Sequence, residues 1–245
     1  MLLYGFHSVT ARLRNAPASI KTVYLDRDRD DPRARELHRL AARQQLAISR
    51  VDGARLDRMC AGKRHQGVVA LVEPAIPSAS LPERLAQVAE AGGEPLLLLL
   101  DGVTDPRNLG ACLRVADGAG VHAVVAPKDH SCQLTDVAIH TASGAAEHVP
   151  YIQVTNLTRT IEDLQIAGLR VLGTADRADA SLYQTDLAGP LAWVLGAEDK
   201  GLRRLVREQC DRLIAIPMLG QVESLNVSVA AGVVLYETVR QRGGH

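Results

Sequence analysis

Hydrophobic and polar positions divide the chain into an irregular first part and a more regular remainder. In residues 1–73, short apolar or β-branched segments alternate with polar segments rich in Arg, Ala, Leu and Glu, which indicates a compact α/β module. We expect helices from near Ser8, at 32–45 and at 54–60, and strands at 20–25, 46–51 and 67–72. Ser8 is expected to cap the first helix, and Pro32 suits the first turn of the second.

The next twenty residues have the composition of a connector. Pro74, Pro77 and Pro82 stiffen its start, and Gly92-Gly93 loosens its end. One short helix at 81–91 fits inside it. The sequence therefore predicts a first domain at 1–73, a linker at 74–93 and a second domain at 94–245.

From Glu94 onward, strand and helix patterns alternate. Residues 96–100 and 123–126 are uninterrupted apolar segments, as in strands of a parallel sheet that is covered on both faces. Asn156 is expected to cap a helix that Gly168 ends. Three further strands and a last helix are expected at 170–173, 191–195, 213–216 and 224–240. These units predict an α/β fold with an open, mostly parallel sheet and helices on both faces.

Composition narrows the class of protein. Hydrophobic residues make up 47% of the chain, as in ordinary globular proteins, and the longest apolar run is too short to span a membrane. The N-terminus lacks the pattern of a signal peptide, so we expect a cytoplasmic protein. The four cysteines lie far apart without a C-x-x-C pair, which indicates neither a disulfide framework nor a metal site.

The formal net charge of zero conceals a difference between the two predicted domains. Residues 1–73 carry 14 Lys and Arg against 8 Asp and Glu, a net charge of +6, and residues 74–245 carry the opposite net charge. A basic small domain is suited to a polyanion such as nucleic acid. Solvated helix faces rich in arginine explain the same charge equally well.

A first polar segment, residues 101–114, directly follows a buried strand. Asn108 is expected to cap the helix that begins there, because Pro106 disfavours helix before it. Arg114 lies less than two turns further along. Both side chains then lie towards the carboxyl edge of the sheet, where open α/β proteins bind ligands. An ordinary strand-to-helix turn with a surface arginine is the alternative.

A second segment, residues 193–203, runs from a strand through a loop into a helix. Gly196 and Gly201 allow the backbone to approach a ligand closely. The spacing matches neither a Walker A loop nor a Rossmann G-x-G-x-x-G motif, which argues against a nucleotide-dependent enzyme of those classes.

A third segment, residues 216–232, joins the last strand to the last helix. Ser224, Asn226 and Ser228 cluster at the expected helix start, with Ser224 as the expected cap. Capping explains one polar residue there and leaves the other two available for a site. Gly232 inside the helix suggests that another element packs closely against it.

Together these segments resemble the motifs of the SpoU/TrmH family of RNA ribose 2′-O-methyltransferases, in the SPOUT superfamily. The resemblance covers nearly the whole chain, because residues 4–11 and 65–70 are similar to the two ends of that family's RNA-binding domain, of the ribosomal-protein L30e-like fold. It implies a catalytic domain with a trefoil knot, S-adenosylmethionine as methyl donor, no metal, and a homodimer. Residues 216–228 most resemble the members that methylate a guanosine of 23S rRNA, free or in an assembling particle.

The resemblance also assigns residues. It implies that the cofactor pocket is lined by Thr174, Gly196, Ile216 and Leu225. It implies a polar catalytic site formed by Asn108, Arg114, Glu198, Ser224 and Asn226. Asp199 departs from the family pattern, where glycine is frequent, and this puts the local loop conformation in doubt.

Methyl transfer to a hydroxyl needs alignment of donor and acceptor and removal of one proton. The family proposal makes the arginine at the position of Arg114 the base. A guanidinium stays protonated in proteins, so we expect Arg114 instead to hold a substrate phosphate that relays the proton. Transfer RNA, another rRNA site, and a non-catalytic role in ribosome assembly remain the alternatives.

Overall fold

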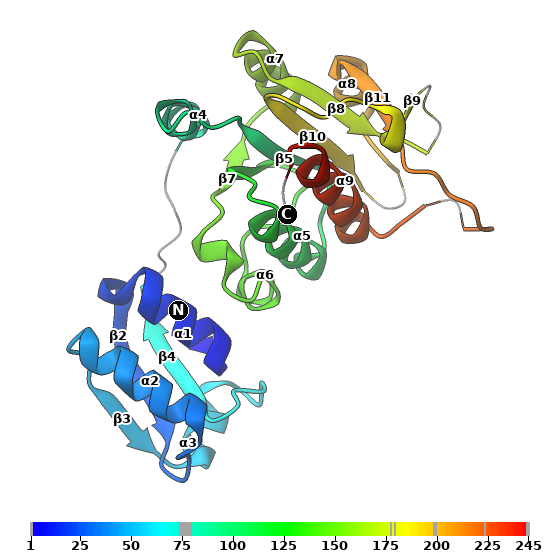
Figure 1. Cartoon of the computed structure of the whole chain (residues 1–245). Helices are drawn as coiled ribbons and strands as arrows, with labels where there is room; N and C mark the ends of the chain where they lie inside the picture. The colour runs from blue at the N-terminus through cyan, green and yellow to red at the C-terminus, as the bar shows by residue number, and fades with distance from the viewer. Residues whose placement is uncertain are drawn as a thin grey trace. The chain divides into compact units, whose positions relative to one another are not determined.

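The computed structural model describes residues 2–73, 80–176, 178, 180–197, 200–222 and 224–243. The chain forms two compact units, residues 1–76 and 77–245 (Figure 1). Helix α4 (Leu81–Glu90), which falls inside the predicted linker, belongs to the second unit, because its Leu81 is buried in that unit's core. The predicted linker boundaries themselves remain a prediction.

The first unit is a four-stranded sheet with the order β1-β4-β2-β3. Strands β2 and β3 are parallel, and β4 is antiparallel to both of its neighbours. The strands are β1 (Leu2–Tyr4), β2 (Ile20–Asp26), β3 (Ile48–Val51) and β4 (Val68–Val72), and the helices are α1 (Phe6–Asn15), α2 (Pro32–Arg43) and α3 (Gly53–Met59), with a 3₁₀ turn at Pro17–Ser19.

The elements of the first unit follow the hydrophobic pattern with two exceptions. Strand β1 was not predicted, because three residues next to the terminus become a strand only by pairing with distant β4. The expected cap at Ser8 is wrong: α1 begins at Phe6 after Gly5, and Ser8 is buried inside it. The buried Arg12 of α1 donates to the carbonyl of Glu73 at 2.8 Å, which ties the helix to the end of β4.

The second unit is a seven-stranded sheet with the order β7-β6-β5-β10-β8-β11-β9. Every strand pair in it is parallel. Its strands are β5 (Leu96–Asp101), β6 (Ala123–Pro127), β7 (Tyr151–Val154), β8 (Arg170–Thr174), β9 (Ala180–Ser181), β10 (Leu191–Gly196) and β11 (Arg212–Ala215). Besides α4, its helices are α5 (Pro106–Gly118), α6 (Asp136–Thr141), α7 (Leu157–Ile166), α8 (Arg204–Gln209) and α9 (Val227–Gln241), with 3₁₀ turns at Ala145–Glu147 and Leu182–Gln184.

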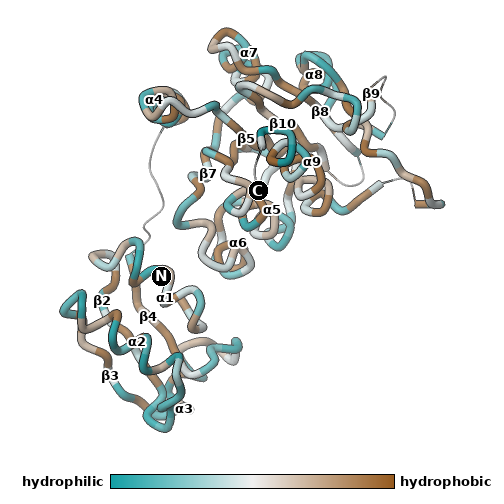
Figure 2. The backbone as a smooth tube through the Cα atoms, in the orientation of Figure 1, coloured by the Kyte–Doolittle hydropathy of each residue, from teal (hydrophilic) through white to brown (hydrophobic). Residues whose placement is uncertain are grey.

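Helices cover both faces of this sheet, and strands β5 and β10 are hydrophobic over most of their length (Figure 2). Leu97 and Leu99 of β5 pack in one core cluster with the apolar residues of α7 and with Val206 of α8. Trp193 of β10 points to the opposite face, where its indole nitrogen donates to Thr238 of α9 at 3.0 Å. Helix α5 packs against α9. The predicted α/β fold class with a parallel sheet is therefore confirmed.

Helix ends in this unit follow local chemistry. Asn156 caps α7 as predicted, and Gly168, with φ of 87°, follows its end. Strand β7 and helix α6 were not predicted. Gly110 of α5 allows α6 to approach closely, since a Cβ there would lie 2.4 Å from the carbonyl oxygen of Ala138. Among the described residues, no helix has the length and hydropathy needed to cross a membrane.

Candidate active site

A pocket of about 260 Å³ lies where three neighbouring parallel strands end, at the carboxyl edge of the larger sheet. Thr174 ends β8, Gly196 ends β10 and Ile216 follows β11. Leu225 lies just before α9, in the segment that follows Ile216. All four residues line the pocket. The structure thus brings together the residues assigned to the cofactor, at the edge where open α/β folds bind ligands.

The loop after Gly196 forms one wall of the pocket. Ala197, Lys200, Gly201 and Leu202 line it, and the backbone amide of Gly201 donates to the carbonyl of Ala197 at 2.8 Å. A Cβ added to Gly196 would lie 2.1 Å from the carbonyl carbon of Gly201. Glycine is therefore required at 196 by the close approach of two backbone segments.

Two of the polar residues assigned to catalysis touch each other. The side-chain nitrogen of Asn226 donates to the side-chain oxygen of Asn108 at 3.0 Å, across 118 positions of sequence. The side-chain oxygen of Asn226 accepts from the backbone amide of Ser228 at 3.0 Å and from its hydroxyl at 2.6 Å. These contacts fix which way the Asn226 amide faces.

Both expected helix caps at the site are wrong. The cap of α5 is Asp105, whose carboxylate accepts from the amide of Arg107, because Pro106 is favourable at the first helical position. Asn108 therefore lies inside the first turn. The cap of α9 is Asn226 rather than Ser224. Ser224 is an exposed residue that lines the pocket.

Neither Arg114 nor the Asn108–Asn226 pair is among the described residues that line the pocket. Arg114 is exposed on α5. It lies six positions after Asn108 on the same helix, which corresponds to a rise of about 9 Å and a difference in direction of about 120° around the helix axis. Glu198 and Asp199 lie outside the described residues.

Three charged residues in the pocket wall were not predicted: Asp176, Lys200 and Arg207. Asp176 follows the end of β8 by two residues, so its position after a buried strand was the available signal. Arg207 was not foreseeable, because only the turn of α8 brings it back to the pocket. The wall thus combines both signs of charge with aliphatic side chains.

Two described thiols of the second unit, Cys210 and Cys132, are poor nucleophiles. Burial raises the pKa of Cys210 to about 12, with Asp211 and Asp101 nearby adding to the effect. Burial also raises the pKa of Cys132. Within the described residues, no group of three or more His, Cys, Asp and Glu is arranged to hold a metal ion. Covalent catalysis by these two thiols is therefore disfavoured.

Known proteins are similar in sequence over nearly the whole chain. The 23S rRNA (guanosine-2′-O-)-methyltransferase RlmB of Ralstonia nicotianae is 54% identical over 241 residues, covering 98% of this chain and 96% of the relative. That of Pseudomonas aeruginosa is 52% identical with the same coverage of 98% and 96%.

Solved structures agree. The SpoU methyltransferase AviRb from Streptomyces viridochromogenes, in complex with the cofactor AdoMet, superposes with a TM-score of 0.76 at 25% identity over 100% of this chain and 91% of that one. An RNA 2′-O ribose methyltransferase gives a TM-score of 0.80 at 26% identity, covering 99% and 88%. Residues 2–78 match the domain family described as "RNA 2'-O ribose methyltransferase substrate binding". Residues 95–236 match the SpoU rRNA Methylase family. As its three polar segments predicted, the chain belongs to the SpoU rRNA methylase family.

Proposed function

We propose that this protein transfers a methyl group from S-adenosylmethionine to the ribose 2′-hydroxyl of a guanosine in 23S rRNA. The observation that carries the proposal is the convergence of Thr174, Gly196, Ile216 and Leu225 on one pocket at the sheet edge. The two RlmB methyltransferases, which are similar to this chain over nearly their full length, support the same reaction and substrate.

The pocket residues fit this cofactor. Aliphatic side chains suit the faces of an adenine ring, and Leu195, Leu202, Ile216 and Val227 supply them. Asp176, Lys200 and Arg207 offer both signs of charge, as the zwitterionic amino-acid end of the cofactor requires. When bound, S-adenosylmethionine supplies an electrophilic methyl group on its sulfonium.

The Asn108–Asn226 pair orients the acceptor. Asn226 is held through its oxygen by Ser228 and through its nitrogen by Asn108, so the pair is already ordered before substrate arrives. Preorganised polar groups lower the barrier because they need not reorganise during the reaction. Ser224, at the pocket wall, and Glu198 complete the proposed polar site.

Arg114 holds a substrate phosphate and stabilises the developing alkoxide. A guanidinium carries a positive charge on a planar fork that matches a phosphate. The hydroxyl proton passes to an oxygen of that phosphate and then to water. Arg114→Lys retains the charge without the fork, so a single-turnover rate close to wild type would contradict this role.

Two chains complete the site as a homodimer. Helix α9 carries a stripe beside α5, in which Tyr236 lies against Gly118 and Gly232 lies near Val115. The stripe consists of Val229, Gly232, Val233 and Tyr236, at spacings of three and four residues. Val229 is 51% and Tyr236 53% exposed, although both are apolar or aromatic. Within the chain, a Cβ on Gly232 would meet only Val115, at an ordinary 3.8 Å, so the close neighbour expected from the sequence is assigned to the partner's helix. Sedimentation of a Val229→Glu variant as a monomer would support this arrangement.

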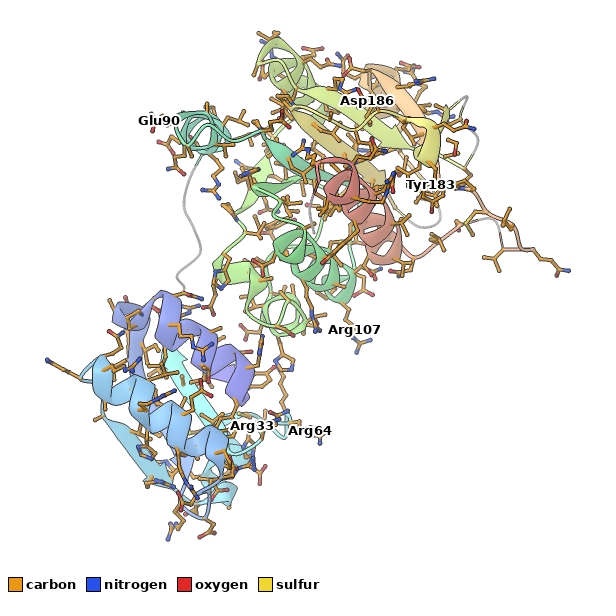
Figure 3. The ribbon with its side chains drawn as sticks, viewed as in Figure 1. Arg33, Arg64, Glu90, Arg107, Tyr183 and Asp186 are labelled. Carbon is orange, nitrogen blue, oxygen red and sulfur yellow. The ribbon has the colours of Figure 1, made fainter. Side chains whose placement is uncertain are left out.

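The first unit selects the RNA. Its net charge is +6, and exposed arginines such as Arg33 and Arg64 lie at its surface (Figure 3). Counterion release from phosphates then makes RNA affinity fall as salt rises. Because the substrate is ribosomal RNA, the cytoplasm is the proposed place of action.

A trefoil knot is proposed for the second unit. The chain runs from β8 to the edge strand β9, returns to β10, goes out again to β11 and finally places α9 against β10. Such repeated crossing is compatible with threading of the last segment. A crystal structure traced continuously through residues 170–245 tests it.

The function is tested by mapping ribose 2′-O-methylation on ribosomal and transfer RNA from cells that lack or carry the gene. Loss of one mark at a 23S guanosine, restored by the wild-type gene and not by Asn108→Ala, is the expected result. Loss of a transfer-RNA mark would move the substrate to the alternative class. Unchanged marks, together with RNA binding and no heat on titration with S-adenosylhomocysteine, would favour a non-catalytic assembly factor.

A further inference from the structure

A fully buried carboxylate anchors the loop that forms one wall of the pocket. The side chain of Asp101, the last residue of β5, has 0% exposure. One of its oxygens accepts from Nε of Arg203 at 2.6 Å, and the other accepts from the backbone amide of Arg203 at 2.8 Å. A buried charge is stable only when it is paired and hydrogen-bonded. Asp101 therefore fixes both the backbone and the side chain of Arg203.

Asp101 controls both ends of that loop. At one end, Gly196 of β10 pairs in register with Asp101 itself. At the other end, Arg203 directly follows Leu202, which lines the pocket. The loop closes on itself in between, through the hydrogen bond from Gly201 to Ala197. The position of this pocket wall thus depends on one carboxylate.

The anchor and the proposed acceptor residues belong to opposite faces of the sheet. Asp101 lies two positions after Leu99, so its side chain shares the sheet face that α7 and α8 cover. Asn108 and Asn226 belong to the elements α5 and α9 on the other face, which Trp193 contacts (Figure 1). A disturbance of the Asp101–Arg203 pair therefore reaches the cofactor wall without directly altering the Asn108–Asn226 pair.

We infer that Asp101 and Arg203 are positioning residues for S-adenosylmethionine, holding Ala197 and residues 200–202 of the pocket wall in the arrangement that binds it. The inference rests on the proposed function, because it assigns this pocket to that cofactor. Arg203 acts through the loop. Its side chain is 47% exposed, so its replacement leaves no large void in the core.

The test compares Arg203→Ala and Arg203→Lys with Arg204→Ala in the full-length protein. Arg204 is the next residue, and its pair with Glu208 is solvent-exposed, so it is a matched control. Calorimetric titration with S-adenosylmethionine should give a dissociation constant at least about tenfold higher for Arg203→Ala, because a buried carboxylate loses its charged partner. All variants at position 203 keep the hydrogen bond from the backbone amide to Asp101, and Arg203→Lys also keeps the side-chain charge. The dissociation constant of Arg203→Lys should therefore lie between those of wild type and Arg203→Ala, while that of Arg204→Ala should match wild type.

Two further readouts separate positioning from general stability. The KM for S-adenosylmethionine should rise in Arg203→Ala while the KM for RNA stays at the wild-type value. Hydrogen exchange at the Gly201 amide should become faster than in the Arg204→Ala control. A lower melting temperature with an unchanged dissociation constant would overturn the inference and leave a purely structural ion pair. Wild-type protein that binds no S-adenosylmethionine would instead overturn the proposed function, and the inference with it.

Discussion

Replacing Gly196 by alanine should disable the cofactor pocket by moving its wall. The added Cβ would lie 2.1 Å from the carbonyl carbon and 2.3 Å from the carbonyl oxygen of Gly201, and 2.4 Å from the amide nitrogen of Leu202. Ordinary carbon contacts are about 3.5–4.0 Å, so one backbone segment must shift by about 1 Å or more. Gly196 is fixed in register with Asp101 on a central strand, so the loop must give way. A misplacement of about 1 Å in a binding site can cost about 10²-fold.

Gly201→Ala is the matched control in the same loop. A Cβ there would meet nothing within 4 Å, and only its φ of 61° opposes the substitution, at a cost of about 1 kcal/mol. Titration with S-adenosylhomocysteine should therefore show binding reduced by about two orders of magnitude in Gly196→Ala and by much less in Gly201→Ala. Thermal unfolding of both variants verifies that they fold. If the dissociation constant of Gly196→Ala stays within about threefold of the wild-type value, its binding free energy is nearly unchanged and this reasoning is refuted.

Three further substitutions separate stability from chemistry. Asn226→Ser should keep the cap of α9 but lose the bond to Asn108, so methyl transfer should fall at least about tenfold with the melting temperature little changed. Glu237→Gln should lower the melting temperature at neutral pH. Hydrogen bonds from Arg240 hold the pKa of Glu237 at about 2, below its ordinary value of 4.5. The carboxylate therefore contributes its full stabilisation above pH 4.5 and loses it as the pH falls towards 2. The difference between variant and wild type should shrink over that acid range in unfolding experiments, and a constant difference would contradict the assignment. Gly110→Ala should destabilise the second unit by about 1–3 kcal/mol in denaturant unfolding, since its Cβ would overlap a carbonyl of α6.

The hydrophobic pattern predicted most of the elements because strands buried on both faces need long apolar runs. Residues 96–100 and 123–126 are such runs, and both are strands of the parallel sheet. Strand β7 has no such run, since its four residues are all half-buried at the sheet edge. The helix caps at the site were misplaced by three residues at α5 and by two at α9, because Asp105 and Asn226 compete locally with Asn108 and Ser224 for the same capping role.

Contacts between residues far apart in the sequence could not be predicted from the hydrophobic pattern. Local patterning does not indicate that β10 inserts between β5 and β8, because strand order depends on contacts between distant segments. The same limit applies to Asp101 and Arg203, which are 102 positions apart. A charged residue ending a run of five leucines was the available signal, since a carboxylate in that place needs a buried partner. The motif resemblance named the pocket residues, and only the fold brought Asp176 and Arg207 to them.

Helix α9 is attached at both of its ends. Asn226 begins it beside the site, and Arg242 follows its end, donating to the carbonyls of Glu94 and Pro95 at 3.3 Å and to that of Gly189. Those carbonyls immediately precede β5 and β10, the two strands whose other ends carry Asp101 and Gly196. A chain shortened before Arg242 would keep every residue assigned to chemistry, yet lose the attachment that sets the height of α9 along these strands. Loss of activity on such truncation would report the placement of a helix rather than the absence of a reacting group.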